Sequence, residues 1–246
     1  MGTLLFYALM VDPTLLVALG AIATAQAKGT KATAKAVQQL LDYCATEPNA
    51  TVQYHASDMI LRIHSDASYL SEPKARSRAR GYFYFGNHID NLHNGAILII
   101  SAILKNALAS AAEAELGALF VNAKEAAALR TTLQEMGHEQ PATPIQVDNS
   151  TACGIVNTTI QQKRSKAIDM QFYWVQDRVK LGEFHVFWKP GNANKADYFT
   201  KHHSVKHHLA NRHKFVLTPE QAVTIYSAPA CVTKANAENT VLWAFH

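Results

Sequence analysis

The sequence predicts an α/β fold in which a mixed five-stranded sheet is flanked by helices and preceded by a helical segment. From residue 59 onward, five apolar, strand-like runs are interspersed with stretches of helical periodicity, and two further helical patterns precede them. Short connections join the first three runs, and helices precede the last two, which is typical of a sheet with antiparallel and parallel pairs. The chain has 246 residues and is 48% hydrophobic, so it can bury a sizeable core.

Two helices are predicted before the sheet. Asp12 and Pro13 form an N-cap and first-turn pair that opens a helix to about residue 27, and Gly29 ends it. Apolar residues then recur at helical offsets over residues 37–44, and this second helix stops near Pro48. The apolar run at residues 4–23 lacks a basic leader and is interrupted by Asp12 and Pro13, so we expect no membrane segment.

The remaining elements follow from the local pattern in chain order. Residues 51–55 alternate as an extended segment, and a turn is expected at Ser57 and Asp58. Strands are predicted at 59–64, 81–85, 96–100, 143–147 and 184–188. Helices are predicted at 110–136, after Asp148, around 168–179 and as a last turn that carries Asp197. Beyond residue 201 there is no reliable periodicity, and residues 204–246 form a tail with no predicted structure.

Charge and cysteine content narrow the class of protein. The formal net charge is +4, which permits nucleic-acid binding without demanding it. The three cysteines Cys44, Cys153 and Cys231 are far apart and odd in number, which fits neither a disulfide framework nor a zinc site. We therefore expect an intracellular protein, in a cytoplasmic particle or in the nucleus.

Four acidic residues occupy informative positions in this pattern. Asp66 and Asp148 close apolar strands, Glu115 lies in the first turns of a helix, and Asp197 lies in the short last helix. Carboxylates are suitable ligands for Mg²⁺, and four that converge can hold two ions for phosphodiester hydrolysis. A single Asp after a strand is more often a turn or capping residue, so none of the four is decisive alone.

Helix geometry distinguishes between two glutamates at the start of the long helix. Glu113 and Glu115 lie about 200° apart at roughly 100° per residue, so only one of them can face the sheet. The apolar arc through Leu116, Leu119 and Leu133 includes Glu115 and leaves Glu113 outside. The helix face thus favours Glu115 over Glu113, although Phe120 blurs the apolar arc.

Several motifs resemble, in order and spacing, those of copia-type retrotransposon ribonuclease H. They are Ile-His-Ser-Asp-Ala-Ser-Tyr at 63–69, Ser-Ala-Ala-Glu-Ala-Glu-Leu-Gly-Ala-Leu at 110–119, Thr-Pro-Ile-Gln-Val-Asp-Asn-Ser-Thr-Ala at 143–152 and Lys-Ala-Asp-Tyr-Phe-Thr-Lys at 195–201. The basic stretch 163–166, which leads into Asp169, also matches. The resemblance covers roughly residues 60–202.

This resemblance implies a ribonuclease H-like fold and hydrolysis of the RNA strand of RNA/DNA hybrids with two Mg²⁺ or Mn²⁺ ions. By motif position, the catalytic and metal-binding residues would be Asp66, Glu115, Asp148 and Asp197. Residues 1–50 resemble the segment that joins such a domain to the polymerase part of a reverse transcriptase, which makes that part an expected partner. The ribonuclease H-like domain would span 51–203, followed by the tail at 204–246. No Tyr-x-Asp-Asp sequence occurs, so we expect no polymerisation by this chain alone.

Substrate contacts are predicted around these motifs. The basic run at Lys74, Arg76, Arg78 and Arg80 is more often a solvated hairpin, but beside a nuclease site it can neutralise phosphates. The other candidates are Ser68, Ser110, Asn149, Lys163, Arg164 and Lys166, although Ser110 and Asn149 also fit simple helix caps. The loop 190–195 lacks the histidine that relatives of this fold often carry before the last aspartate.

Other functions stay open beside hybrid cleavage. A catalytically silent module that binds nucleic acid or a polymerase partner is the main alternative. An integrase-like strand transferase is disfavoured, because its third carboxylate is expected on a late helix, whereas Glu115 precedes the Asp148 strand. The histidines at 202, 203, 207, 208 and 213 lack a cysteine or acidic partner at zinc-finger spacing, which favours a basic surface tail over a metal site.

Overall fold

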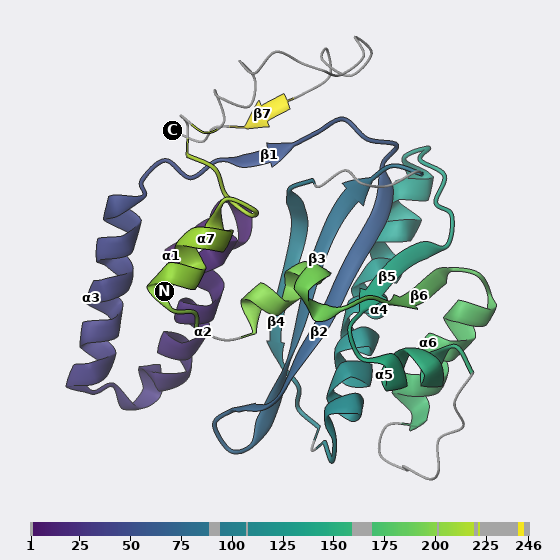
Figure 1. Cartoon of the computed structure of the whole chain (residues 1–246), viewed down its shortest axis with the longest axis horizontal. Helices are drawn as coiled ribbons and strands as arrows, with labels where there is room; N and C mark the ends of the chain where they lie inside the picture. The colour runs from purple at the N-terminus through teal and green to yellow at the C-terminus, as the bar shows by residue number, and fades with distance from the viewer. Residues whose placement is uncertain are drawn as a thin grey trace. The chain divides into compact units, whose positions relative to one another are not determined.

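A computed structural model describes residues 2–88, 94–106, 108–158, 169–200, 202–218, 221 and 241–243 of the chain (Figure 1). The chain divides into two compact units, one of residues 57–201 and one of residues 1–56 with 202–246. Among the described helices, none is both long enough and apolar enough to cross a membrane. The domain boundaries predicted at residues 50 and 203 stay predictions.

The unit of residues 57–201 is built on a mixed five-stranded sheet in the order β4-β3-β2-β5-β6 (Figure 1). The strands are β2 Ile60–Glu72, β3 Arg76–Gly86, β4 Ala96–Ile103, β5 Thr143–Val147 and β6 Phe184–Trp188. Strands β2, β3 and β4 pair antiparallel, whereas β5 pairs parallel with β2 and with β6. The predicted fold class, a mixed sheet flanked by helices, is confirmed.

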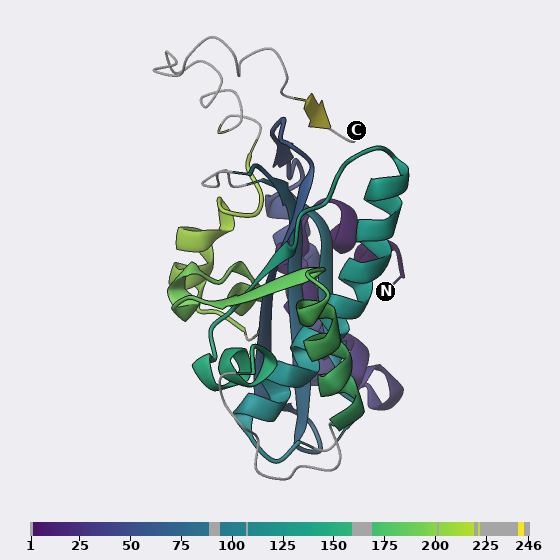
Figure 2. The ribbon, with the colours of Figure 1, turned by 90° about the vertical axis from the view of Figure 1, so that its right-hand side faces the viewer.

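Helices cover this sheet. They are α4 Ala111–Glu135, α5 Ser150–Val156, α6 Asp169–Lys180 and the 3-10 segments η3 Gly191–Ala193 and η4 Lys195–Phe199. Helix α4 runs along one face of the sheet (Figure 2). Its Asn122 donates to Ser65 Oγ at 2.8 Å. Segment η4 contacts His64 instead, and since neighbouring side chains of a strand point to opposite faces, η4 lies on the other face.

The main core lies between the sheet and helices α4, α5 and α6. Its buried side chains include Leu61, Ile63, Phe83, Leu119, Ile145, Val147, Phe172, Val175, Phe184 and Val186. Alternate residues of β2 and β5 supply this apolar layer, so the side chains between them are free to point to the opposite face. The alternation that places every second side chain of these strands in the core therefore also decides which side chains can form a site on the opposite face.

Most predicted elements lie close to the observed ones, but the first strand was placed wrongly. Strand β2 does not end near residue 64: it continues through Asp66 to Glu72 and forms a hairpin with β3. Ladder hydrogen bonds join backbone groups, so the polar side chains of this motif do not stop the strand. The hairpin turn instead lies at residues 73–75, where Lys74 and Ala75 adopt φ values of 63° and 53°.

The second unit contains helices and a short two-stranded sheet. The elements are α1 Gly2–Met10, η1 Pro13–Leu15, α2 Leu16–Ala25, η2 Gln26–Lys28, α3 Lys31–Thr46, β1 Val52–Tyr54, α7 Val205–Arg212 and β7 Val241–Trp243. Asp12 caps η1 as predicted, by accepting from Thr14 N at 3.0 Å. The tail for which the sequence pattern indicated no element contains α7 at residues 205–212.

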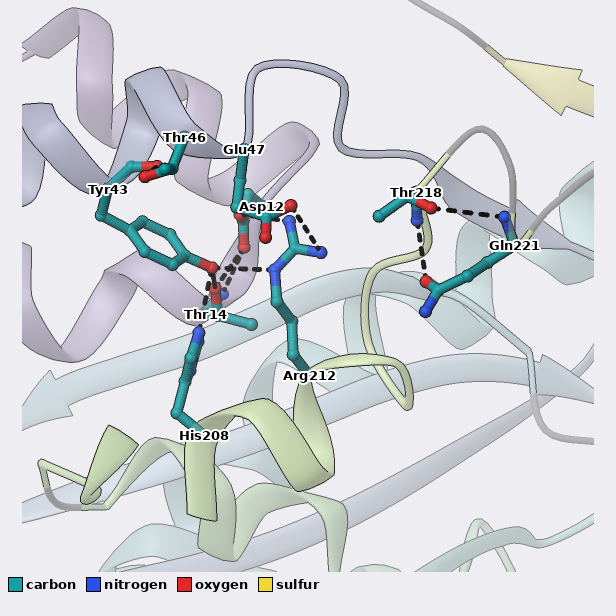
Figure 3. A network of polar contacts seen from close by, with 9 residues as sticks. All are labelled: Asp12, Thr14, Tyr43, Thr46, Glu47, His208, Arg212, Thr218 and Gln221. Carbon is teal, nitrogen blue, oxygen red and sulfur yellow. Dashed lines mark hydrogen bonds and ion pairs between the residues drawn. The ribbon is translucent and has the colours of Figure 1, made fainter. Parts of the chain in front are cut away.

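A partly buried polar network attaches α7 within this unit (Figure 3). Arg212 donates from Nε to Tyr43 Oη at 2.8 Å, and its guanidinium lies 3.6 Å from Asp12 and 3.5 Å from Glu47. His208 Nε2 lies 3.1 Å from the same Tyr43 hydroxyl. These partners are more than 160 residues apart in the chain, so no local pattern in the His-rich stretch revealed the helix that they stabilise.

Candidate active site

The candidate site is centred on Asp66, in the middle of the central strand β2. Its side chain is only 4% exposed, and its Oδ2 atom has no hydrogen-bond partner among the described residues. Asp66 has the same parity along the strand as His64, so its carboxyl group faces the side of the sheet where η4 lies.

Glu115 reaches Asp66 from the first turns of α4. Ser110 begins this helix as its N-cap and accepts from Glu113 N at 3.2 Å. The Glu115 side chain is 6% exposed, and its Oε1 atom accepts from Ala67 N at 3.2 Å, next to Asp66. Glu113 instead accepts from Ala109 N at 2.7 Å, away from the site. The apolar arc of the helix thus carries Glu115 toward the sheet.

Asp148 directly follows β5, where the strand passes into α5. The neighbouring Asn149 caps α5 by accepting from Ala152 N at 2.9 Å. The loop after β6 comes so close that a Cβ atom added at Gly191 would lie 2.8 Å from Asp148 Oδ2. Trp188 Nε1 also donates to the Asp148 carbonyl oxygen at 2.9 Å. Gly191 and Trp188 therefore shape the surroundings of this carboxylate, a role that the sequence pattern did not show.

One carboxylate oxygen each from Asp66, Glu115 and Asp148 lie within 4.8 Å of one another. Burial, followed by the charges of Asp148 and Asp197, raises the pKa of Asp66 to about 8. Burial, followed by the charges of Asp66 and Asp148, raises the pKa of Glu115 to about 9. The pKa of Asp148 is raised as well, by burial and by Asp197. The protein alone therefore stabilises the ionised form of this group poorly.

Asp197 lies near this group without belonging to its 4.8 Å core. It sits in η4, half-buried, and its charge acts on both Asp66 and Asp148. Thr200 Oγ1 donates to the Asp197 carbonyl oxygen at 2.7 Å, which closes the short 3-10 segment. The structure thus brings three of the four predicted carboxylates together and places the fourth at their edge.

The predicted substrate contacts are less uniform. Arg76 is exposed at the β2–β3 hairpin, whereas Arg78 is buried and forms an ion pair with Glu72. Ser68 Oγ accepts from Ser71 Oγ at 2.6 Å, while Ser110 and Asn149 serve as helix caps. Lys163, Arg164 and Lys166 lie outside the described residues. Of the arginines predicted to contact substrate and described in the structure, Arg76 is therefore the one that a phosphate can reach.

Comparison with known proteins shows that the chain is similar in sequence to part of a transposon polyprotein. No family model matches the chain. A retrovirus-related Pol polyprotein from transposon TNT 1-94 of Nicotiana tabacum is 26% identical over 219 residues, which is 89% of this chain. The chain resembles a segment of a retrotransposon polyprotein. This similarity confirms the resemblance to a copia-type polyprotein that the motifs predicted. The matched segment is 16% of that polyprotein, so the activities of the whole do not transfer to it directly.

Solved structures of ribonucleases H are also similar to the chain. LC11-RNase H1, isolated from compost by a metagenomic approach, is 12% identical with a TM-score of 0.42, over 57% of this chain and 92% of its own. The same protein in complex with an RNA/DNA hybrid is 13% identical with a TM-score of 0.43, over 56% and 92%. The N-terminal RNase H domain of a Mycobacterium tuberculosis protein is 13% identical with a TM-score of 0.42, over 58% and 91%. These TM-scores are low, so we assign the fold from the strand order and the helix positions described above.

Proposed function

We propose that this chain is a metal-dependent endonuclease that hydrolyses the RNA strand of RNA/DNA hybrids. The observation that carries the proposal is the convergence of Asp66, Glu115 and Asp148, from three separate elements, with one carboxylate oxygen each within 4.8 Å. Such a group of buried, mutually repelling carboxylates is costly unless cations offset its charge. Its retention in a chain that resembles part of a retrotransposon polyprotein supports a nuclease site.

The chemistry of the donor set suits Mg²⁺ or Mn²⁺. Asp66 Oδ2 and Glu115 Oε2 are buried and lack hydrogen-bond partners among the described residues, so each has an oxygen free for a cation. All the donors are carboxylate oxygens, which these hard ions prefer. Asp66, Glu115 and Asp148 would hold one ion. Asp148 and Asp197 would together contribute ligands to a second ion.

The side chains of the site have distinct tasks in this proposal. Asp66 projects from the central strand, and the Ala67 N–H restricts the orientation of Glu115 by donating to its Oε1 atom. When bound, divalent ions lower the pKa of a water nucleophile and neutralise charge on the phosphate. Asp148 and Asp197 lie at the more accessible side of the group, since both are only half-buried, and they are closest to an incoming phosphodiester.

The hybrid substrate rests on the motif resemblance and on the polyprotein relative. Retrotransposon polyproteins combine polymerase and ribonuclease H parts, so the polymerase part of a reverse transcriptase is the partner that we propose. Arg76, exposed on the hairpin beyond Asp66, is available to contact a phosphate of the hybrid. This contact would contribute affinity and would not select a sequence.

The direct test is cleavage of a hybrid labelled in its RNA strand. The full chain is incubated with Mg²⁺ or Mn²⁺, with chelator, and with RNA/RNA and DNA/DNA duplexes of the same sequence as controls. We expect metal-dependent cleavage of the RNA strand in the hybrid alone, with a loss of at least about 100-fold in Asp148→Asn. The variant keeps the size and hydrogen-bonding capacity of the side chain, so circular dichroism should show an unchanged fold.

Two outcomes would overturn the proposal. One is a folded wild-type chain that is as inert as Asp148→Asn with either ion. The other is equal cleavage by both proteins, which would place the activity outside this site. Salt-sensitive binding of the hybrid without cleavage would favour the alternative of a catalytically silent module that binds nucleic acid.

A further inference from the structure

We propose that His64 is a positioning residue that holds η4 against β2 and thereby places the Asp197 carboxylate at the metal-binding group. This inference rests on the proposed function, because it assigns Asp197 to the same site. His64 is not itself offered as a metal ligand or a catalytic residue.

The central contact joins two segments that are far apart in the chain. The backbone N–H of Lys195 donates to Nδ1 of His64 at 3.0 Å, across 131 residues. Because Nδ1 accepts this bond, the proton of the neutral ring is on Nε2, which lies 3.4 Å from the Tyr84 hydroxyl. The ring is 8% exposed and packs edge-on against Tyr84 at a centroid distance of 5.5 Å, so its orientation is restricted.

Asn194 makes a parallel set of contacts one residue earlier. Its Nδ2 donates to the Ser65 carbonyl oxygen at 2.8 Å, and its Oδ1 accepts from Ala196 N at 3.0 Å as the cap of η4. Residues 64 and 65 directly precede Asp66, and residues 194 and 195 come shortly before Asp197. The contacts of His64 with Lys195 and of Ser65 with Asn194 therefore set the position of the Asp66 carboxylate relative to that of Asp197.

Apolar packing alone does not provide this positioning. Tyr198 and Phe199 are buried, and Phe199 stacks on Tyr82 at 6.3 Å with an interplanar angle of 14°. Burial keeps the segment on the sheet, but the hydrophobic effect is non-directional and does not select one rotation of a five-residue 3-10 segment. The directional bonds to His64 and to the Ser65 carbonyl oxygen perform that selection together, so the loss of the His64 bond should displace Asp197 without releasing η4.

Two matched pairs of variants test the contact from both sides. His64→Leu removes the acceptor, whereas His64→Asn keeps an acceptor oxygen near the position of Nδ1. Lys195→Pro removes the donor, and Lys195→Ala keeps it while it removes the same side chain. Proline is tolerated here because Lys195 is the first residue of η4 and Asn194 already has an extended ψ of 111°.

The readout is Mg²⁺ and Mn²⁺ affinity from calorimetry, together with thermal unfolding without metal. We expect His64→Leu and Lys195→Pro to raise the Kd about 10-fold or more, because a displaced Asp197 carboxylate no longer contributes to the bound ion. His64→Asn and Lys195→Ala should stay within about threefold of wild type. In a double-mutant cycle, Asp197→Asn should add little to His64→Leu, because both remove the contribution of the same carboxylate.

The inference is overturned if His64→Leu and Lys195→Pro bind metal like wild type. It is also overturned if the losses from His64→Leu and Asp197→Asn simply add, or if Lys195→Ala weakens binding as much as Lys195→Pro. These results do not depend on cleavage, so a wild-type chain that binds metal but leaves the hybrid intact would refute the proposed function alone. A folded chain that binds neither ion would refute both.

Discussion

Replacing Asp66 by Asn should stabilise the metal-free protein even though it removes a proposed catalytic residue. The reason is electrostatic: the folded state raises the pKa of Asp66 from its ordinary 3.8 to about 8. Between these values the folded state binds more protons than the unfolded state, so wild-type stability falls as the pH rises from about 4 to about 8. Asn cannot ionise, so the variant escapes this loss.

The size of the effect follows from the same values. At pH 7 the unfolded carboxyl is ionised and the folded one is mostly protonated, so only the interval from 3.8 to 7 counts. At about 1.4 kcal/mol per pH unit, this gives an upper limit of about 4 kcal/mol for the gain in unfolding free energy. Relaxation around the site will reduce it, and we expect about 1–3 kcal/mol, or a melting temperature higher by roughly 2–10 °C.

The assay is thermal unfolding by circular dichroism at pH 4 and pH 7 with chelator, and at pH 7 with saturating Mg²⁺. Asp66→Asn should gain stability at pH 7, gain nothing at pH 4, and lose its advantage when Mg²⁺ stabilises the wild type. Asp177→Asn, on the exposed side of α6, is the control and should change little under any condition. A variant that is destabilised at pH 7 without metal, or equally shifted at both pH values, would refute the reasoning.

Three further outcomes are expected from the geometry. Glu115→Gln should lower hybrid cleavage by at least about 100-fold, whereas Glu113→Gln should leave the rate within about threefold, and equal rates would show that the helix face does not matter. Gly81→Ala should destabilise the protein by about 1–3 kcal/mol in chemical denaturation, since the added Cβ would lie 2.1 Å from Asn122 Oδ1; unchanged stability would mean that Asn122 can move aside. Tyr43→Phe should lower the unfolding free energy by about 1–2 kcal/mol, because it removes the hydroxyl at the centre of a partly buried network, while hybrid cleavage stays unchanged. A loss of cleavage in a folded Tyr43→Phe protein would contradict that separation.

The sequence was informative where structure is local. The long helix predicted at 110–136 matches α4: Ser110 caps it, and Gly137 follows it with a φ of 88°. The strands predicted at 143–147 and 184–188 match β5 and β6. Helix periodicity also separated Glu115 from Glu113, because a helical face is defined within a few turns.

Strand pairing explains the errors near Asp66. The polar motif around this residue looked like a strand end, yet ladder pairing with β3 continues to Glu72. In this hairpin Glu72 is the register partner of Arg76, yet its carboxylate forms an ion pair with Arg78, so an arginine predicted to contact phosphate is part of a buried ion pair. His64 was passed over, although a polar residue inside an apolar strand could have drawn attention to it.

The sequence by itself determined the order and type of the elements, the kind of residues at their ends and, through its motifs, the family that the chain resembles. Only the tertiary structure decided which of these side chains meet. The carboxylates of Asp66, Glu115 and Asp148 converge because β2, α4 and β5 pack together, and the two contacts that hold η4 in place span 129 and 131 positions of the chain. Periodicity reports which face of an element is buried, whereas the distance between two faces depends on register and packing between segments that no local pattern encodes.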